Sequence, residues 1–192
     1  MSAVLAAAEV SRFTSGTITT AGFALGLALL GTEHWRWYKG GAAAAGPGGG
    51  GGRDPKALIP YWFGITCGIL MVACPAGFLG TVAGFLRWGG NGLGGMAMGW
   101  LTGQDGATLA SASAPGLDSY GAVVVTALTA ALWWLRKQIA KAAKGKWKKG
   151  IVTGCLLCIS TGTAAIIAQT VVGGANDLGA FILGQIATGT LV

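Results

Sequence analysis

Long stretches without a charged residue are the feature that most limits how this chain can fold. Four such stretches span residues 13–32, 57–86, 119–135 and 150–176. A helix needs roughly 20 consecutive, mostly apolar residues to cross the hydrocarbon core of a bilayer, and each stretch approaches or exceeds that length. The sequence therefore predicts an all-α polytopic membrane bundle of about four transmembrane helices.

The composition supports a single membrane domain over residues 1–192. Hydrophobic residues make up 53% of the chain and charged residues only 10%, whereas soluble domains carry about 25% charged residues. Most of the chain therefore cannot face water. Glycine is also very frequent, at 36 residues, and in membrane helices glycine lets backbones approach closely.

Basic residues alternate between the two sides of the predicted bundle. The connection after the second stretch carries none, whereas residues 136–149 carry seven. Cytoplasmic loops of membrane proteins are enriched in Lys and Arg, so the basic connections are expected inside and both termini outside. The predicted location is the mitochondrial inner membrane or the bacterial cytoplasmic membrane. The basic residues of the first connection are Arg36, Lys39, Arg53 and Lys56.

Other segments have distinct compositions. Residues 41–52, GAAAAGPGGGGG, have the composition of a flexible linker. Residues 89–103 are uncharged and glycine-rich, and are predicted to be interfacial or re-entrant. Residues 178–192 are expected to form a short interfacial helix or a strand-like arm. Within the second stretch, Pro75 predicts a kink near Cys74.

Glycines four residues apart recur within the predicted spans. Small residues at this spacing give a helix a smooth face on which another membrane helix can pack closely. We expect these faces to pack within the bundle or against another subunit. The residues are Gly22 and Gly26, Gly64 and Gly68, Gly80 and Gly84, and Gly150 and Gly154.

Few polar groups are placed where catalysis would need them. The acidic residues all fall in predicted loops or termini, which argues against a proton pump or a secondary transporter. His34 is expected to be an interfacial imidazole among aromatic residues, and not a haem or pigment ligand. Cys155 and Cys158 form a CxxC pair inside an apolar run, where they are expected to act as small packing residues. We predict no enzyme activity, no cofactor and no metal site.

The basic segment 136–149, RKQIAKAAKGKWKK, is the candidate contact surface. Apolar residues recur in it at four-residue steps, so a helical continuation would be amphipathic. Three interpretations are open: an anchor on anionic lipid headgroups, a docking site for an acidic subunit, and a contact with nucleic-acid phosphates. The basic residues are Arg136, Lys137, Lys141, Lys144, Lys146, Lys148 and Lys149.

An arginine followed by glycines lies near the end of the second stretch. Arg87 is followed by Asn91 and then by Gly94, Gly95 and Gly99. With four glycine-rich spans, outer termini and inner basic loops, the chain resembles the four-helix Tim family of mitochondrial inner-membrane proteins. That family includes translocase channel subunits and an accessory subunit of respiratory complex I, and its signature has an aspartate where this chain has Asn91. The resemblance covers roughly residues 13–176 and implies a subunit of a larger membrane complex.

A second resemblance concerns residues 119–176, an apolar hairpin with a basic connection. It is similar to small membrane proteins of actinobacterial mobile elements, including plasmid-spread and pilin-like proteins. We expect a non-catalytic accessory or scaffolding subunit that acts through transmembrane helix packing, with other membrane subunits and lipids as partners. The alternative is a DNA-transfer, pilin-like or pore-forming membrane protein that uses residues 136–149, with nucleic acid as its partner.

Overall fold

The computed structural model describes residues 16–44, 54–74, 77–112, 114–135 and 141–188, and within them helices dominate. The predicted all-α class is confirmed. A short 3-10 turn, η1 (Pro55–Leu58), and two short strands, β1 (Thr17–Thr19) and β2 (Thr108–Ser111), accompany the helices. The helices are α2 (Thr20–Ala44), α3 (Ile59–Ala73), α4 (Phe78–Thr102), α5 (Ser119–Leu135), α6 (Lys141–Leu157) and α7 (Gly162–Thr188).

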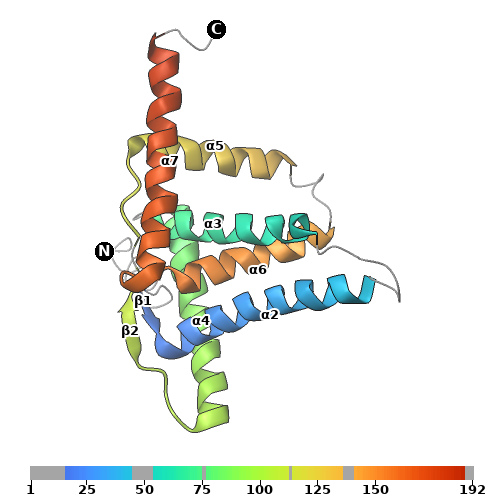
Figure 1. Ribbon diagram of the computed structural model, residues 1–192. Helices are drawn as coiled ribbons and strands as arrows, with labels where there is room; N and C mark the ends of the chain where they lie inside the picture. Colours follow the sequence, from blue (N-terminus) through green and yellow to red (C-terminus); the bar gives the residue numbers. More distant parts are fainter. Residues whose placement is uncertain (1–15, 45–53, 75–76, 113, 136–140, 189–192) are drawn as a thin grey trace.

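The helices lie in two directions. Helices α2, α3, α5 and α6 lie side by side, whereas α4 and α7 run across them at the end where α2 and α5 begin (Figure 1). The antiparallel pair β1–β2 lies at the same end, with Thr17 opposite Ser111. Helices α4 and α7 each extend beyond the body of the molecule, one to each side (Figure 1).

Two of the four predicted spans are not continuous helices in the structure. The stretch 57–86 is divided, because α3 ends at Ala73 and α4 begins at Phe78. Cys74, which precedes Pro75, is extended (ψ 102°), as expected where the proline ring disfavours helical geometry in the residue before it. The predicted kink is therefore a complete break. The stretch 150–176 is likewise divided between α6 and α7, and Gly162 at the start of α7 has φ 70°.

Several segments outside the predicted spans are helical. Residues 89–102 continue α4, residues 141–149 form the first half of α6, and residues 178–188 complete α7. Of the predicted linker, residues 41–44 belong to α2 and residues 45–52 lie outside the described residues. The lengths of the charge-free stretches therefore predicted these helix boundaries wrongly. Glycine-rich and lysine-rich segments also form parts of helices when those helices pack on neighbouring ones.

Two helices of the described chain are long and apolar enough to cross a membrane, namely Pro55–Ala73 and Gly162–Thr188. Helix Ser119–Leu132 is apolar but shorter. The two longer helices run across one another (Figure 1). Length and composition therefore allow a membrane protein.

The two halves of the chain repeat each other. Residues 64–68 read GITCG and residues 150–154 read GIVTG, at matching places in α3 and α6. Residues 91–94 read NGLG and residues 176–179 read NDLG, at matching places in α4 and α7. The first half, α2–α3–α4, is thus the counterpart of the second half, α5–α6–α7.

Contacts between helices also correspond between the two halves of the chain. Helix α2 packs on α4 as α5 packs on α7, and α4 reaches α6 as α7 reaches α3. The most extensive contact, between α3 and α6, joins the two halves. The buried faces also correspond, because Ala83, Arg87, Gly90 and Gly94 of α4 match Ala168, Val172, Ala175 and Gly179 of α7.

Candidate functional site

The contact between α3 and α6 is built from two pairs of glycines. Gly64 and Gly68 of α3 face Gly150 and Gly154 of α6. A Cβ atom added at Gly64 would lie 3.0 Å from Cα of Gly150, and one added at Gly150 would lie 2.9 Å from Cα of Gly64. At Gly68 an added Cβ would lie 3.1 Å from Cα of Gly154. The two backbones therefore touch directly, which no larger residue at these positions permits.

The other predicted packing glycines lie elsewhere. Gly22 of α2 packs against the side chain of Asn91, and a Cβ atom added at Gly26 would lie 3.1 Å from Leu156 Cβ. Gly80 lies over the backbone oxygen of Cys74. Gly84 is buried in α4. The structure thus brings four of the eight residues into one contact and distributes the others among separate contacts.

An asparagine on each crossing helix holds the start of another helix. On α4, Asn91 Oδ1 accepts from the Thr19 amide (3.1 Å) and from Thr19 Oγ1 (3.2 Å), while Nδ2 donates to Thr17 O (3.0 Å). On α7, Asn176 Oδ1 accepts from the Asp118 amide (3.2 Å). The sequence interpretation named Asn91 only as a departure from a family signature and did not name Asn176, although the N-x-L-G pattern occurs at both.

Each asparagine acts beside a helix cap and a glycine. Thr19 Oγ1 accepts from the amide of Gly22 at 3.0 Å, and Asp118 Oδ1 accepts from the amide of Gly121 at 2.7 Å. Such side chains satisfy amide groups that the first turn of a helix leaves without partners. Both glycines leave room for the amide of the asparagine that packs on them.

The described part of the basic segment, residues 141–149, lies on α6 at the end of the body away from α4 and α7. Lys146 Nζ donates to the carbonyl of Ala57 at 2.8 Å, and Lys149 Nζ lies 3.5 Å from Glu33 Oε2. Lys148 is exposed. Lys141 and Lys144 lie in α6 with side chains that are not described, and Arg136 and Lys137 lie outside the described residues.

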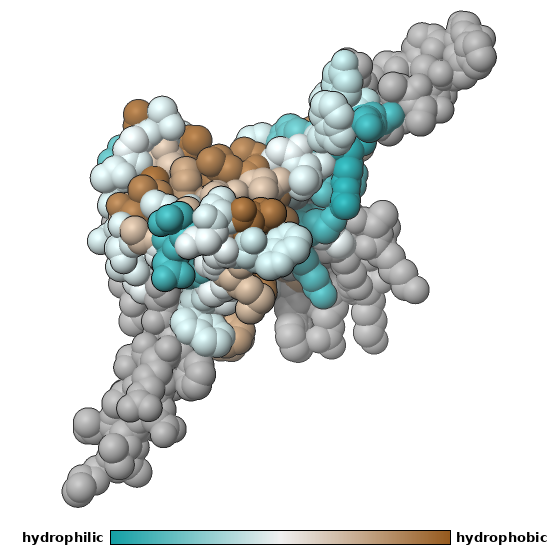
Figure 2. Space-filling model, turned by 90° about the horizontal axis from the view of Figure 1, so that it is seen from below, coloured by the Kyte–Doolittle hydropathy of each residue, from teal (hydrophilic) through white to brown (hydrophobic). Residues whose placement is uncertain are grey.

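The first basic connection lies at this same end. Lys39 Nζ stands 5.1 Å from the ring centre of Trp35, and Trp37 Nε1 donates to the carbonyl of Asp54 at 3.0 Å. Figure 2 shows hydrophilic residues gathered toward the end of the body at which α2 ends. The prediction that Glu33 lies in a loop is wrong, because Glu33 is buried within α2 and pairs with Lys149. We call this end, where α2 ends and α6 begins, the basic end.

The histidine and the cysteines considered as candidate site residues do not come together in one site. His34 packs edge-on against Trp62, with ring centres 5.5 Å apart. Cys155 and Cys158 are free thiols and are buried. Arg87 is buried within electrostatic reach of both thiols. No cluster of three His, Cys, Asp or Glu residues suited to a metal ion occurs among the described residues.

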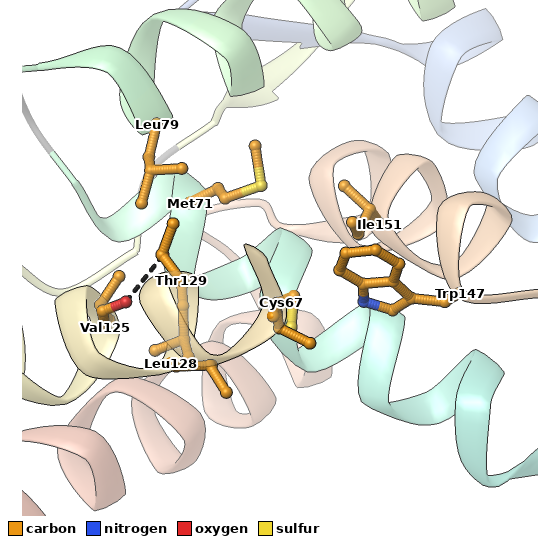
Figure 3. Close-up of a pocket in the computed structure, with 10 residues that line it drawn as sticks. Cys67, Met71, Leu79, Val125, Leu128, Thr129, Trp147 and Ile151 are labelled. Carbon is orange, nitrogen blue, oxygen red and sulfur yellow. Dashed lines mark hydrogen bonds between the residues drawn. The ribbon is translucent and has the colours of Figure 1, made fainter. Parts of the chain in front are cut away.

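A cavity of about 330 Å³ lies between α3, α5 and α6. Cys67 and Met71 of α3, Leu128 of α5 and Trp147 of α6 are among its lining residues (Figure 3). Thr129 also reaches it, but its hydroxyl donates to the carbonyl of Val125 at 2.8 Å within the same helix. The cavity is therefore almost wholly apolar.

No protein-family model, curated protein or solved structure matches this chain. The resemblance to the Tim family stays a prediction. At its quoted positions, Arg87 and Gly94 are buried in α4 and Asn91 holds the start of α2.

Proposed function

We propose that this chain is a non-catalytic accessory subunit of a larger membrane assembly and acts through helix packing. The observation that carries the proposal is the pair of apolar faces that α4 and α7 turn away from the body. Both helices use one face to pack on the bundle and leave another apolar face uncovered. Such faces fit lipid or neighbouring subunits.

The uncovered faces are large and apolar. In α4, Trp100 is 86% exposed and Met96 is 73% exposed. In α7, Phe181 is 63% exposed and Ile186 is 59% exposed. Contiguous apolar patches of this kind are rare on soluble monomers and mark sites of protein–protein or membrane contact. Because α4 and α7 extend beyond the body (Figure 1) and these side chains are exposed, neighbouring subunits can reach them.

The distribution of charge supports an orientation in the membrane. Cations of both basic connections gather at the basic end, and α4 and α7 cross the opposite end. Basic residues concentrate on the cytoplasmic side of membrane proteins. In this proposal the chain lies in the mitochondrial inner or bacterial cytoplasmic membrane with the basic end on the inner side, and α4 and α7 cross the bundle at the end away from it.

Placing charge on these faces tests the proposal. Trp100→Glu and Phe181→Glu are each expected to remove at least nine-tenths of the partner subunits that remain bound to the wild-type chain in mild detergent. The reason is that a carboxylate buried in an apolar contact loses its hydration. Native mass spectrometry measures the assembly, and circular dichroism checks that the helices persist.

The matched control is Gln169→Glu, which places the same charge on an exposed polar position of α7. It is expected to leave the assembly intact. A wild-type chain that is monomeric in mild detergent contradicts the proposal. Retention of partners by both glutamate variants contradicts it as well.

A DNA-transfer protein is the second candidate, and the shared location of the two basic connections favours it. Under this alternative the full chain binds duplex DNA with an affinity that falls as salt rises, because cations displace condensed counterions from phosphates. Lys148→Ala is expected to reduce the slope of log affinity against log salt by about 0.9. Lys149→Ala is expected to change it less, because Lys149 already pairs with Glu33. Absence of salt-sensitive binding excludes this candidate.

A further inference from the structure

The basic end collects cations from three segments that are far apart in the sequence. Lys146 Nζ of α6 donates to the carbonyl of Ala57 in η1 at 2.8 Å, and Lys149 of α6 lies 3.5 Å from Glu33 of α2. These two contacts hold the later part of α2, the turn η1 and the start of α6 together. The described basic residues of these segments are Arg36, Lys39, Lys56, Lys146, Lys148 and Lys149.

Most of this positive charge is not neutralised by acidic residues of the described chain. Only two described carboxylates lie in the same segments, Glu33 and Asp54. Glu33 is buried and pairs with Lys149, and Asp54 Oδ1 accepts from the backbone amide of Lys56 at 2.9 Å. An excess of exposed cations attracts anions from outside the chain. The exposed cations that form no ion pair with any described residue are Arg36, Lys39, Lys56 and Lys148.

Exposed tryptophan rings lie at the same end. Trp35 of α2 is 60% exposed, Trp62 of α3 is 48% exposed and Trp134 of α5 is 83% exposed. Trp62 is level with this part of α2, because its ring centre lies 5.5 Å from that of His34. Trp134 lies one residue before the end of α5, which ends toward the same side of the body as α2 (Figure 1). Tryptophan concentrates at membrane–water interfaces, where its apolar ring and its polar N–H both find a suitable environment.

Rings and cations share one exposed surface of α2. Trp35 and Tyr38 stack with ring centres 6.2 Å apart, and Lys39 Nζ lies 5.1 Å from the ring centre of Trp35. Arg36 lies three residues before Lys39, on the same side of the helix. Duplex DNA would pair with the cations but would leave the rings in water. An anionic bilayer surface engages both groups, since it offers phosphates to the cations and a less polar layer to the rings.

We propose that the basic end binds the headgroups of anionic phospholipids. The phosphates pair with the exposed cations, and the tryptophan rings lie beside them at the level of the glycerol groups. This site rests on the membrane location proposed above and adds a preference for negative headgroups. A monomeric chain that selects anionic lipid would contradict the subunit role and leave the lipid site standing.

Two lipids that differ only in the headgroup test this site. The full chain, held in a steroid-based detergent that has no acyl chain, is titrated with dioleoyl phosphatidylglycerol and separately with dioleoyl phosphatidylcholine. Native mass spectrometry measures the dissociation constant for each lipid. The wild type is expected to bind phosphatidylglycerol about tenfold more tightly, because several exposed cations face the negative headgroup. Arg36→Gln/Lys39→Gln is expected to lower this preference about fivefold.

The matched control is Gln104→Glu/Gln169→Glu, which lowers the net charge by the same amount at exposed positions after α4 and in α7. It is expected to keep the preference of the wild type, and circular dichroism checks that both variants fold. Equal affinity of the wild type for the two lipids, or an unchanged preference in the folded Arg36→Gln/Lys39→Gln variant, overturns the proposal. Displacement of phosphatidylglycerol by a short duplex DNA assigns the surface to nucleic acid and overturns it as well.

Discussion

Gly150→Ala is expected to lower the free energy of unfolding by about 3 kcal/mol, because no space exists for the added methyl group. A Cβ atom at this position would meet the backbone of α3, 2.9 Å from Cα of Gly64 and 3.0 Å from the amide nitrogen of Ile65. Backbone atoms cannot turn aside as a flexible side chain can. The helices must therefore separate, and the contact that joins the two halves of the chain loosens.

The matched control lies in the same helix. An added Cβ at Gly145 would meet nothing within 4 Å, so Gly145→Ala is expected to raise stability by up to about 1 kcal/mol through helix propensity. Thermal and denaturant unfolding of the two variants in one detergent, followed by circular dichroism, measures the difference. Equal stability of Gly150→Ala and Gly145→Ala would show that α3 and α6 do not meet through their glycines.

Asn91→Ala is expected to lower stability by about 3 kcal/mol, since three hydrogen bonds of its side chain are lost at once. Two of these bonds reach Thr19 and one reaches Thr17 O, all between 3.0 and 3.2 Å. Asn176→Ala removes the equivalent bonds to Asp118 N and Gly116 O, which measure 3.2 and 3.5 Å. Its expected cost is about 1 kcal/mol, because longer bonds contribute less.

Hydrogen exchange distinguishes a hydrogen-bonding role of the two asparagines at the helix starts from a role in packing alone. The Thr19 amide, which donates to Asn91 Oδ1, is expected to exchange at least tenfold faster in Asn91→Ala. In Asn176→Ala the Thr19 amide is expected to keep its protection while the Asp118 amide loses it. Equal effects of both variants on the Thr19 amide would contradict a local clamp at each helix start.

Particular residues show how far sequence reasoning reached. The Gly-x-x-x-Gly spacing identified Gly64, Gly68, Gly150 and Gly154 as packing positions, but it could not say that the two pairs meet each other. That pairing joins residues far apart in the chain and depends on how α3 and α6 are placed. Pro75 marked a change of direction, because the residue before a proline leaves helical geometry. The sequence did not show that the next helix crosses the bundle.

The sequence by itself determined the helical class, the apolar character and the accumulation of cations in two connections, because these follow from local composition and spacing. Tertiary structure alone decided the rest. It set α4 and α7 across the other helices, paired Lys149 with Glu33, and left a cavity at Val125 where Gly26 closes the matching contact in the other half. The physical reason is that the length of a charge-free stretch indicates only whether the segment can be buried in an apolar environment. The direction of the next helix, after one helix ends, is set by contacts between segments that are far apart in the chain.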